Sequence, residues 1–120
     1  MRASLYRWAE MPKEQVSERF GRKFIAGQNT MVCWLELKPG CVVPEHNHES
    51  EQVSYVVEGT LRFRVAGEEF LVEAGSALLI PPHTPHSAEV VGEGTVIDLD
   101  IFSPVRRDWL EGRDDYLRGS

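Results

Sequence analysis

The sequence has little of what an exported, membrane-spanning or nucleic-acid-binding protein needs. No apolar run approaches the roughly 20 residues that cross a bilayer, and the first ten residues contain no apolar segment typical of a signal peptide. Asp and Glu outnumber Lys and Arg by 19 to 13, so the chain lacks the basic surface that nucleic acids require. We therefore expect a cytoplasmic protein with no membrane partner and no nucleic-acid partner.

Cysteine is also scarce, with only Cys33 and Cys41 in the chain. They could bridge the two ends of one hairpin, but a chain without an export signal favours two reduced thiols. The 120 residues are 42% hydrophobic and 27% charged, which is typical of one globular domain with a real core.

Short strands separated by turns dominate the sequence pattern. Segments of four to eight β-branched, aromatic or alternating residues are bounded by Gly or Pro turns. The predicted strands include residues 31–37, 52–57, 60–65, 69–72, 77–80 and 95–102. This spacing predicts an all-β sandwich or barrel. Ser103 and Pro104 are expected to begin a short C-terminal helix, as its N-cap and first helical residue.

The same pattern divides the chain into three parts. Residues 1–21 are predicted to form a polar N-terminal arm, either flexible or docked on the sheet or on a neighbour, with a short helical turn at residues 12–16. Residues 22–110 form the predicted barrel, and residues 111–120 a frayed tail. A basic cluster of Arg19, Arg22 and Lys23 is expected to be a solvated surface.

All four histidines fall in two short stretches of the chain. His46 and His48 are separated by one residue, so in a strand they project from the same face. His83 and His86 form the second stretch. Two imidazoles on one face, with a further ligand returning after a turn, can enclose a single metal ion. The clustering therefore predicts a metal site rather than scattered surface histidines.

The spacing of these residues resembles the two motifs of the cupin family. The first motif is matched by Gly40, His46, His48, Gln52 and Gly59, and the second by Gly75, Pro81 and His86. The resemblance covers residues 22 to 110 and implies a double-stranded β-helix, which is a jelly-roll barrel. The sequence departs from the commoner family pattern at Gln52, where Glu is more frequent, and at His83 and Val90.

The resemblance implies a divalent metal ion bound by His46, His48, Gln52 and His86, with Zn, Ni, Mn, Fe, Co and Cu as candidates. Gln in place of Glu removes one negative charge from the ligand set. This change favours an anionic ligand, and it favours Lewis-acid chemistry over redox chemistry. Glu51 is the alternative ligand if Gln52 does not bind, and His83 is not expected to be a ligand.

The residues at the end of the last predicted strand resemble one particular group within the cupin family. Residues 100–108, Asp-Ile-Phe-Ser-Pro-Val-Arg-Arg-Asp, are similar to the ending of the pectin-degradation cupins that linearise unsaturated uronates. The resemblance implies that a small anionic sugar, a 4,5-unsaturated uronate, is converted to a linear 5-keto-4-deoxyuronate. It assigns Asp100 as the acid/base group, Arg106 as a carboxylate clamp and Phe102 as an apolar wall. A non-catalytic cupin that binds a sugar or small acid and an iron-dependent oxygenase are the alternatives.

Alternation along the last strand leaves the placement of Asp100 open. One face carries Asp98, Asp100 and Phe102, and the other carries Ile97, Leu99 and Ile101. Alternation alone favours a buried aliphatic face, whereas the resemblance places Asp100 and Phe102 inside the barrel. The second arrangement leaves three aliphatic side chains outside. It therefore predicts a homodimer in which this sheet is covered, with the N-terminal segment of the same chain or of a neighbour contributing to the cover.

Overall fold

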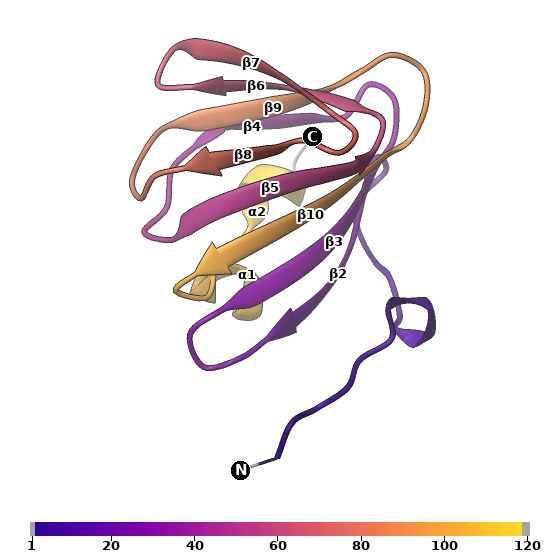
Figure 1. Ribbon diagram of the computed structural model, residues 1–120, viewed down its shortest axis with the longest axis vertical. Coiled ribbons are helices and arrows are strands. Elements are labelled where there is room, and N and C mark those ends of the chain that lie inside the picture. The colour runs from indigo at the N-terminus through magenta and orange to yellow at the C-terminus, as the bar shows by residue number, and fades with distance from the viewer. Residues whose placement is uncertain (1, 119–120) are drawn as a thin grey trace.

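Two antiparallel sheets packed face to face form the computed structural model, which describes residues 2–118 (Figure 1). The six-stranded sheet consists of β1 (Glu14–Ser17), β2 (Phe20–Ala26), β3 (Met31–Leu37), β10 (Val96–Ser103), β5 (Glu51–Glu58) and β8 (Ala77–Ile80), in that spatial order. The four-stranded sheet consists of β4 (Val42–His46), β9 (His86–Val91), β6 (Thr60–Val65) and β7 (Glu68–Glu73). The predicted all-β jelly-roll barrel is confirmed.

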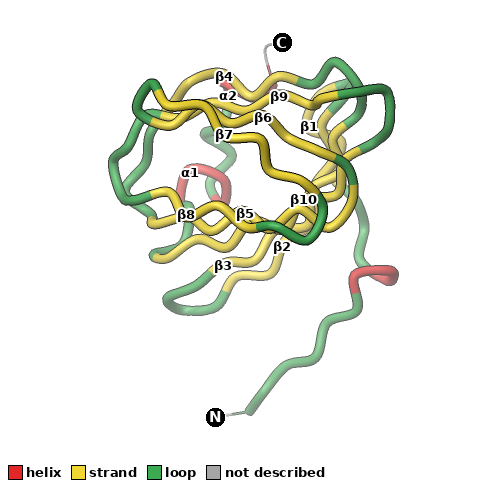
Figure 2. The backbone as a smooth tube through the Cα atoms, turned by 45° about the horizontal axis from the view of Figure 1, so that its top comes forward, coloured by secondary structure: helices red, strands yellow, loops and turns green. Residues whose placement is uncertain are grey.

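Three helices of three or four residues complete the described chain: η1 (Trp8–Glu10), α1 (Arg107–Leu110) and α2 (Asp115–Arg118). None of the helices in residues 2–118 has the length and apolar character needed to cross a membrane. Figure 2 shows the N-terminal segment running away from the two sheets, while α1 lies beside the opening between them.

Residue alternation explains what fills the barrel. In β3, every second side chain from Met31 to Leu37 is buried, and the residues between them are half-buried. Strand β10 lies between β3 and β5 and pairs with both, so its alternate side chains also point inward.

The core that results contains two buried free thiols, Cys33 and Cys41. Neither thiol is in a disulfide, as expected, and burial raises the pKa of Cys41 to about 11.

Glycine is required at the turn between β5 and β6. Gly59 has φ of +86°, a left-handed conformation that favours glycine. A Cβ atom built at this position would lie 2.8 Å from the Cγ2 atom of Val96 on β10. The backbone at Gly59 therefore lies closer to strand β10 than a residue with a side chain would allow.

The N-terminal prediction is wrong in three respects. Residues 12–16 do not form a helical turn, because Glu14–Ser17 is strand β1, which pairs with β2 at the edge of the larger sheet. The sheet thus begins before the predicted boundary at residue 22. The basic cluster is not uniformly solvated either, since only 1% of the surface of Arg22 is exposed.

The C-terminal prediction also needs correction. Ser103 does not cap a helix, because it is the last residue of β10 and pairs with Glu51 of β5. Helix α1 begins later, at Arg107. The predicted frayed tail contains α2, in which Leu117 is buried, and residues 119–120 of that prediction lie outside the described chain.

A buried ion pair joins the two ends of the chain. The Nη2 atom of Arg22 on β2 lies 2.5 Å from Oδ2 of Asp114, and neither side chain is more than 1% exposed. Arg118 adds a second contact to Asp114 at 2.7 Å, and Glu14 contacts both arginines. Burial raises the pKa of Asp114, but hydrogen bonds from Arg118 and Arg22 outweigh it and hold the pKa below its ordinary value. The carboxylate is therefore ionised, and it holds α2 against the barrel.

Replacing Asp114 with Asn is expected to lower the free energy of unfolding by about 3 kcal/mol, because a buried guanidinium then loses its main anionic partner. Urea denaturation monitored by tryptophan fluorescence measures this loss. The matched control is Arg113→Gln, which removes the exposed ion pair between Arg113 and Glu111 and should change the stability by less than about 1 kcal/mol. Equal effects from the two substitutions would contradict the role given to the buried pair.

Candidate metal centre

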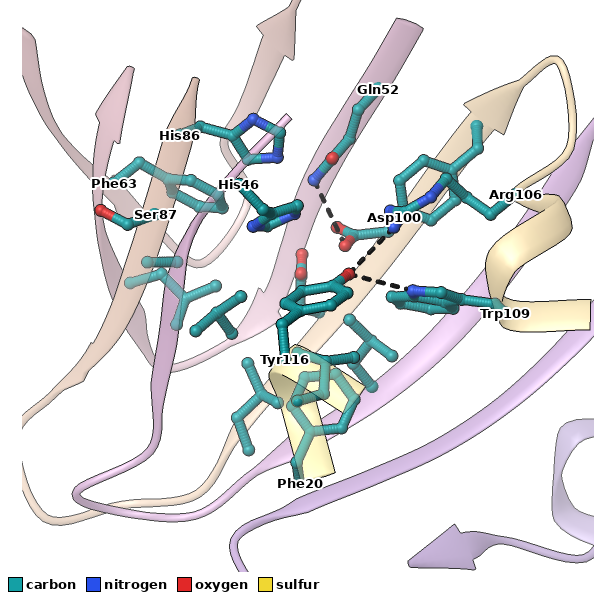
Figure 3. Close-up of a pocket in the computed structure, with 18 residues that line it drawn as sticks. Phe20, His46, Gln52, Phe63, His86, Ser87, Asp100, Arg106, Trp109 and Tyr116 are labelled. Atoms are coloured by element: carbon teal, nitrogen blue, oxygen red, sulfur yellow. Dashed lines mark hydrogen bonds between the residues drawn. The ribbon is translucent and has the colours of Figure 1, made fainter. Parts of the chain in front are cut away.

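Three imidazoles converge at one end of the smaller sheet. His46 is the last residue of β4 and pairs in register with His86, the first residue of β9. His48 lies just beyond β4, so the loop and not strand periodicity brings it back to the other two rings. One potential ligand atom from each of the three histidines lies within 4.8 Å of the others. Figure 3 shows the rings of His46 and His86 side by side, close to Gln52.

Each imidazole is oriented by a backbone carbonyl two residues away. The Nδ1 atoms of His46, His48 and His86 lie 2.8, 2.9 and 2.8 Å from the carbonyl oxygens of Pro44, Ser50 and Thr84. An Nδ1–H group that donates to a carbonyl leaves the Nε2 atom unprotonated, with its lone pair free. This arrangement is typical of histidines that bind a metal ion through Nε2.

Two local observations show that the residues fit a cation. The Nε2 atom of His86 is buried and has no hydrogen-bond partner among the described residues. The Nε2 atom of His48 lies 3.0 Å from Oε1 of Gln52, although a neutral imidazole that donates from Nδ1 has no proton left for that contact. Two lone pairs that face each other at this distance are stabilised by a positive ion between them.

The amide of Gln52 is held so that its oxygen faces the histidines. Its nitrogen donates to the hydroxyl of Ser54 at 2.8 Å and to Oδ2 of Asp100 at 3.3 Å. Ser54 donates in turn to Oδ1 of Asp100 at 2.6 Å. A Glu at position 52 would place a second carboxylate against Asp100, so this network accounts for the amide. The side chain of Glu51, the alternative ligand, is exposed.

The pKa values of the histidines favour metal binding over protonation. Burial lowers the pKa of His46 to about 3 and that of His48 to about 4, and it also lowers the pKa of His86. All three rings are therefore neutral near pH 7. Neutral imidazoles and an amide oxygen are ligands for borderline divalent ions.

His46 and His86 border a small internal cavity that also contains the predicted catalytic groups. Its volume is about 30 Å³, which is enough for one or two water molecules. The polar residues around it include His46, Gln52, His86, Asp98, Asp100, Arg106 and Tyr116. Asp100 is 6% exposed and Phe102 is 1% exposed, so both lie inside the barrel, on the face that the family resemblance indicates.

Arg106 lies in the cavity, but its guanidinium already has partners. It donates two hydrogen bonds to Asp108, at 2.9 and 2.6 Å, and one to the hydroxyl of Tyr116 at 2.9 Å. Its charge also lies over the rings of Phe102 and Trp109, about 5 Å from each. The guanidinium of Arg106 therefore lies beside Phe102 and is paired with a carboxylate of the same chain.

Sequence reasoning missed Tyr116, which lies in the middle of the site (Figure 3). Its ring centroid lies 4.7 Å from that of His46, and its hydroxyl accepts a hydrogen bond from the indole of Trp109 at 3.1 Å. The only sequence signal was an aromatic residue beside Leu117 in an otherwise polar tail. His83, which was not expected to be a ligand, is exposed.

Comparisons with known proteins agree with this geometry. The family model described as the cupin domain matches residues 33–102. The "Pectin degradation protein KdgF" of Dickeya dadantii is 30% identical over 104 residues, which cover 84% of this chain and 93% of that protein. The structure of KdgF from a Halomonas species superposes with a TM-score of 0.83 at 28% identity, covering 90% of this chain and 99% of the other. An RmlC-like cupin from Shewanella frigidimarina gives 0.82 at 28% identity, with coverages of 90% and 96%.

Replacing His46 or His48 with Ala is expected to reduce the bound divalent metal to less than a tenth of the wild-type content, because two imidazoles and one amide cannot complete the ligand set. Elemental analysis of the purified protein measures the content. The exposed His83 supplies the matched control, and His83→Ala should keep the full content. Metal retained in His46→Ala, or lost in His83→Ala, would show that the ligands are assigned wrongly.

Proposed function

Because the chain belongs to the cupin family, we propose that it is a metal-binding cupin of pectin degradation that converts a 4,5-unsaturated uronate to a linear 5-keto-4-deoxyuronate. The observation that carries the proposal is the position of Asp100, which shares one cavity with His46 and His86 and is linked through the amide of Gln52 to His48. The similarity to two KdgF proteins over nearly their whole length supports the substrate class.

The proposed reaction moves one proton within the sugar. Ring opening removes the proton of the anomeric hydroxyl, and protonation of C4 then gives the 5-keto product. Asp100 is suited to the first of these transfers, because its carboxylate is held by Ser54 and Gln52 and faces the cavity. A divalent ion bound by the histidines and Gln52 supplies Lewis acidity that stabilises negative charge on the sugar oxygens.

Arg106 is proposed to recognise the carboxylate of the sugar. It lines both the internal cavity and an open surface hollow of about 390 Å³, which His48 and Asp108 also line. A planar guanidinium binds a carboxylate through two parallel hydrogen bonds. In the structure Asp108 occupies that edge of Arg106, so the sugar carboxylate takes the place of Asp108 when it binds.

A sugar ring is larger than the internal cavity, so binding beside Asp100 requires a side chain to move. Tyr116 is the group that fills the space next to His46, and it belongs to the last described helix. We propose that the tyrosine ring moves aside when the sugar enters. A crystal structure with bound uronate in which Tyr116 keeps its contacts to Arg106 and Trp109 would contradict this.

Asp100→Asn is expected to keep the fold and the metal content but to lower the rate of uronate linearisation by about 10²- to 10⁴-fold, because an amide cannot accept the anomeric proton. The rate is measured as loss of the absorbance of the unsaturated sugar. Asp115→Asn, the same substitution at an exposed carboxylate, is the matched control and should retain wild-type activity.

The same assay separates the alternative functions. Activity that requires oxygen would identify an oxygenase, and tight binding of the sugar without turnover by wild-type protein would identify a binding protein. Either result would contradict the proposed reaction.

We also propose that the protein is a homodimer. The outer face of the larger sheet exposes apolar side chains on three adjacent strands, including Tyr55 (41% exposed), Leu79 (59%) and Ile101 (38%). The N-terminal segment covers only part of this sheet, where Trp8 packs on Trp34 with ring centroids 5.9 Å apart. Burying one such apolar side chain contributes about 1.5–3 kcal/mol, which favours contact with a second copy.

Sedimentation equilibrium is expected to give the mass of two chains for the wild type and of one chain for Leu79→Arg, because an unpaired charge then enters the contact. Val42 is 55% exposed on β4 of the other sheet, so Val42→Arg is the matched control and should stay dimeric. A monomeric wild type, or a monomeric Val42→Arg, would count against this contact face.

A further inference from the structure

The mechanism described so far leaves one buried acid in the cavity without a role. Asp98 lies on the inward face of β10, is 2% exposed and lines the same cavity as Asp100. Its Oδ1 atom is buried and has no hydrogen-bond partner among the described residues. An unpaired buried charge is strongly unfavourable, so a carboxyl group in this position is neutral.

Asp98 and Asp100 are neighbours on one face of β10, but they differ in their hydrogen-bond partners. Asp100 accepts hydrogen bonds from Ser54 and Gln52, which stabilise its carboxylate form. Burial, and then the charge of Asp100 and a hydrogen bond to it, raise the pKa of Asp98 well above its ordinary value. The pKa of Asp100 is raised too, chiefly by burial, although hydrogen bonds from Asp98 and Ser54 act in the opposite direction. Because Asp100 has two hydrogen-bond donors and Oδ1 of Asp98 has none, the proton that the two carboxyl groups share resides on Asp98.

The other ionisable groups near this carboxyl pair do not change that assignment. The guanidinium of Arg106 is positive and favours the carboxylate form of Asp100, whereas His86 is neutral near pH 7. Cys33, on the adjacent strand β3, is a buried thiol whose pKa is raised well above its ordinary value, chiefly by burial. It is therefore neutral and adds no charge beside Asp98.

We propose that Asp98 is a second catalytic acid, which gives its proton to C4 of the sugar while Asp100 takes the proton of the anomeric hydroxyl. This inference rests on the proposed function, and it divides between two groups the acid and base roles that were first given to Asp100 alone. Pairs of acids whose environments separate their protonation states are a recurrent way to carry out acid and base chemistry in one site.

The proposed step balances without any further reactant. The carboxylate of Asp100 removes the O1 proton, the O1 electron pair forms the C1 carbonyl, and the bond between C1 and the ring oxygen breaks. The electrons of that bond form the C5 carbonyl, and the former double bond takes the proton of Asp98 at C4. One proton then passes from Asp100 to Asp98 through their hydrogen bond and restores the starting state.

The substitution Asp98→Asn distinguishes a catalytic from a structural role of this residue. The amide group of the variant keeps a hydrogen-bond donor for Asp100 and a carbonyl oxygen in place of Oδ1, so a purely structural role survives the substitution. The amide has no acidic proton, so the variant cannot deliver a proton to C4 of the sugar. The variant is therefore expected to keep the fold, the metal content and the KM for the sugar.

The test compares metal-loaded wild type with Asp98→Asn, and uses Asp115→Asn as the control at an exposed carboxylate. We expect kcat of Asp98→Asn to fall at least about 100-fold, with loss of the alkaline limb of the wild-type pH profile, while the control is unchanged. Infrared difference spectra, which need no substrate, should show a protonated-carboxyl band in the wild type and Asp115→Asn that is absent from Asp98→Asn.

Two results would overturn the inference while leaving the proposed function intact. One is a kcat of Asp98→Asn within about threefold of wild type with the same pH profile, and the other is a protonated-carboxyl band that survives the substitution. A wild-type protein that binds metal but does not consume the unsaturated sugar would overturn the proposed function, and this role of Asp98 with it.

Discussion

The register of β10 between β3 and β5 is the constraint on which the rest of the site depends. Backbone pairing on both edges places Asp100 opposite Ser54 and Phe102 opposite Gln52, and so sets the hydrogen bonds that join the acid to the amide. Because side chains alternate, a slip by one residue would turn both aspartates outward and carry the aliphatic side chains inward. A strand with two neighbours cannot slip without breaking both ladders, so the polar interior is as well fixed as the apolar core.

The histidines are oriented by a different and more local means. Each ring donates to a carbonyl two residues away in sequence, so its direction is set by the loop or strand end on which it lies. The three lone pairs thus converge through contacts within the chain. A site oriented in this way needs little rearrangement when an ion binds, which favours affinity because less conformational entropy is lost.

The barrel and the histidine cluster could be predicted from sequence because their signals are local: alternation, turn glycines and ligand spacing. Alternation alone would have placed Asp98 and Asp100 in solvent, since two carboxylates are ordinarily exposed. Only the resemblance to the cupin family indicated that this face of β10 points into the barrel. The pairing of Arg22 with Asp114 and the position of Tyr116 had no local signal, because each depends on contact between distant parts of the chain. Arg22 looked like part of a solvated charge cluster for the same reason.

The few unsatisfied polar atoms in the described chain are not scattered through the barrel. The buried side-chain atoms without a partner are Nη1 of Arg22, Nε2 of His86 and Oδ1 of Asp98, and the last two residues line one cavity. A folded protein tolerates such atoms where a ligand satisfies them, because each unpaired group otherwise destabilises the fold by about 1–3 kcal/mol. The Nε2 atom of His86 is an electron-pair donor suited to a cation, whereas Asp98 carries a proton beside a carboxylate. The cavity therefore combines a place for positive charge with a nearby proton source, and the proposed ring opening followed by protonation at carbon would use both.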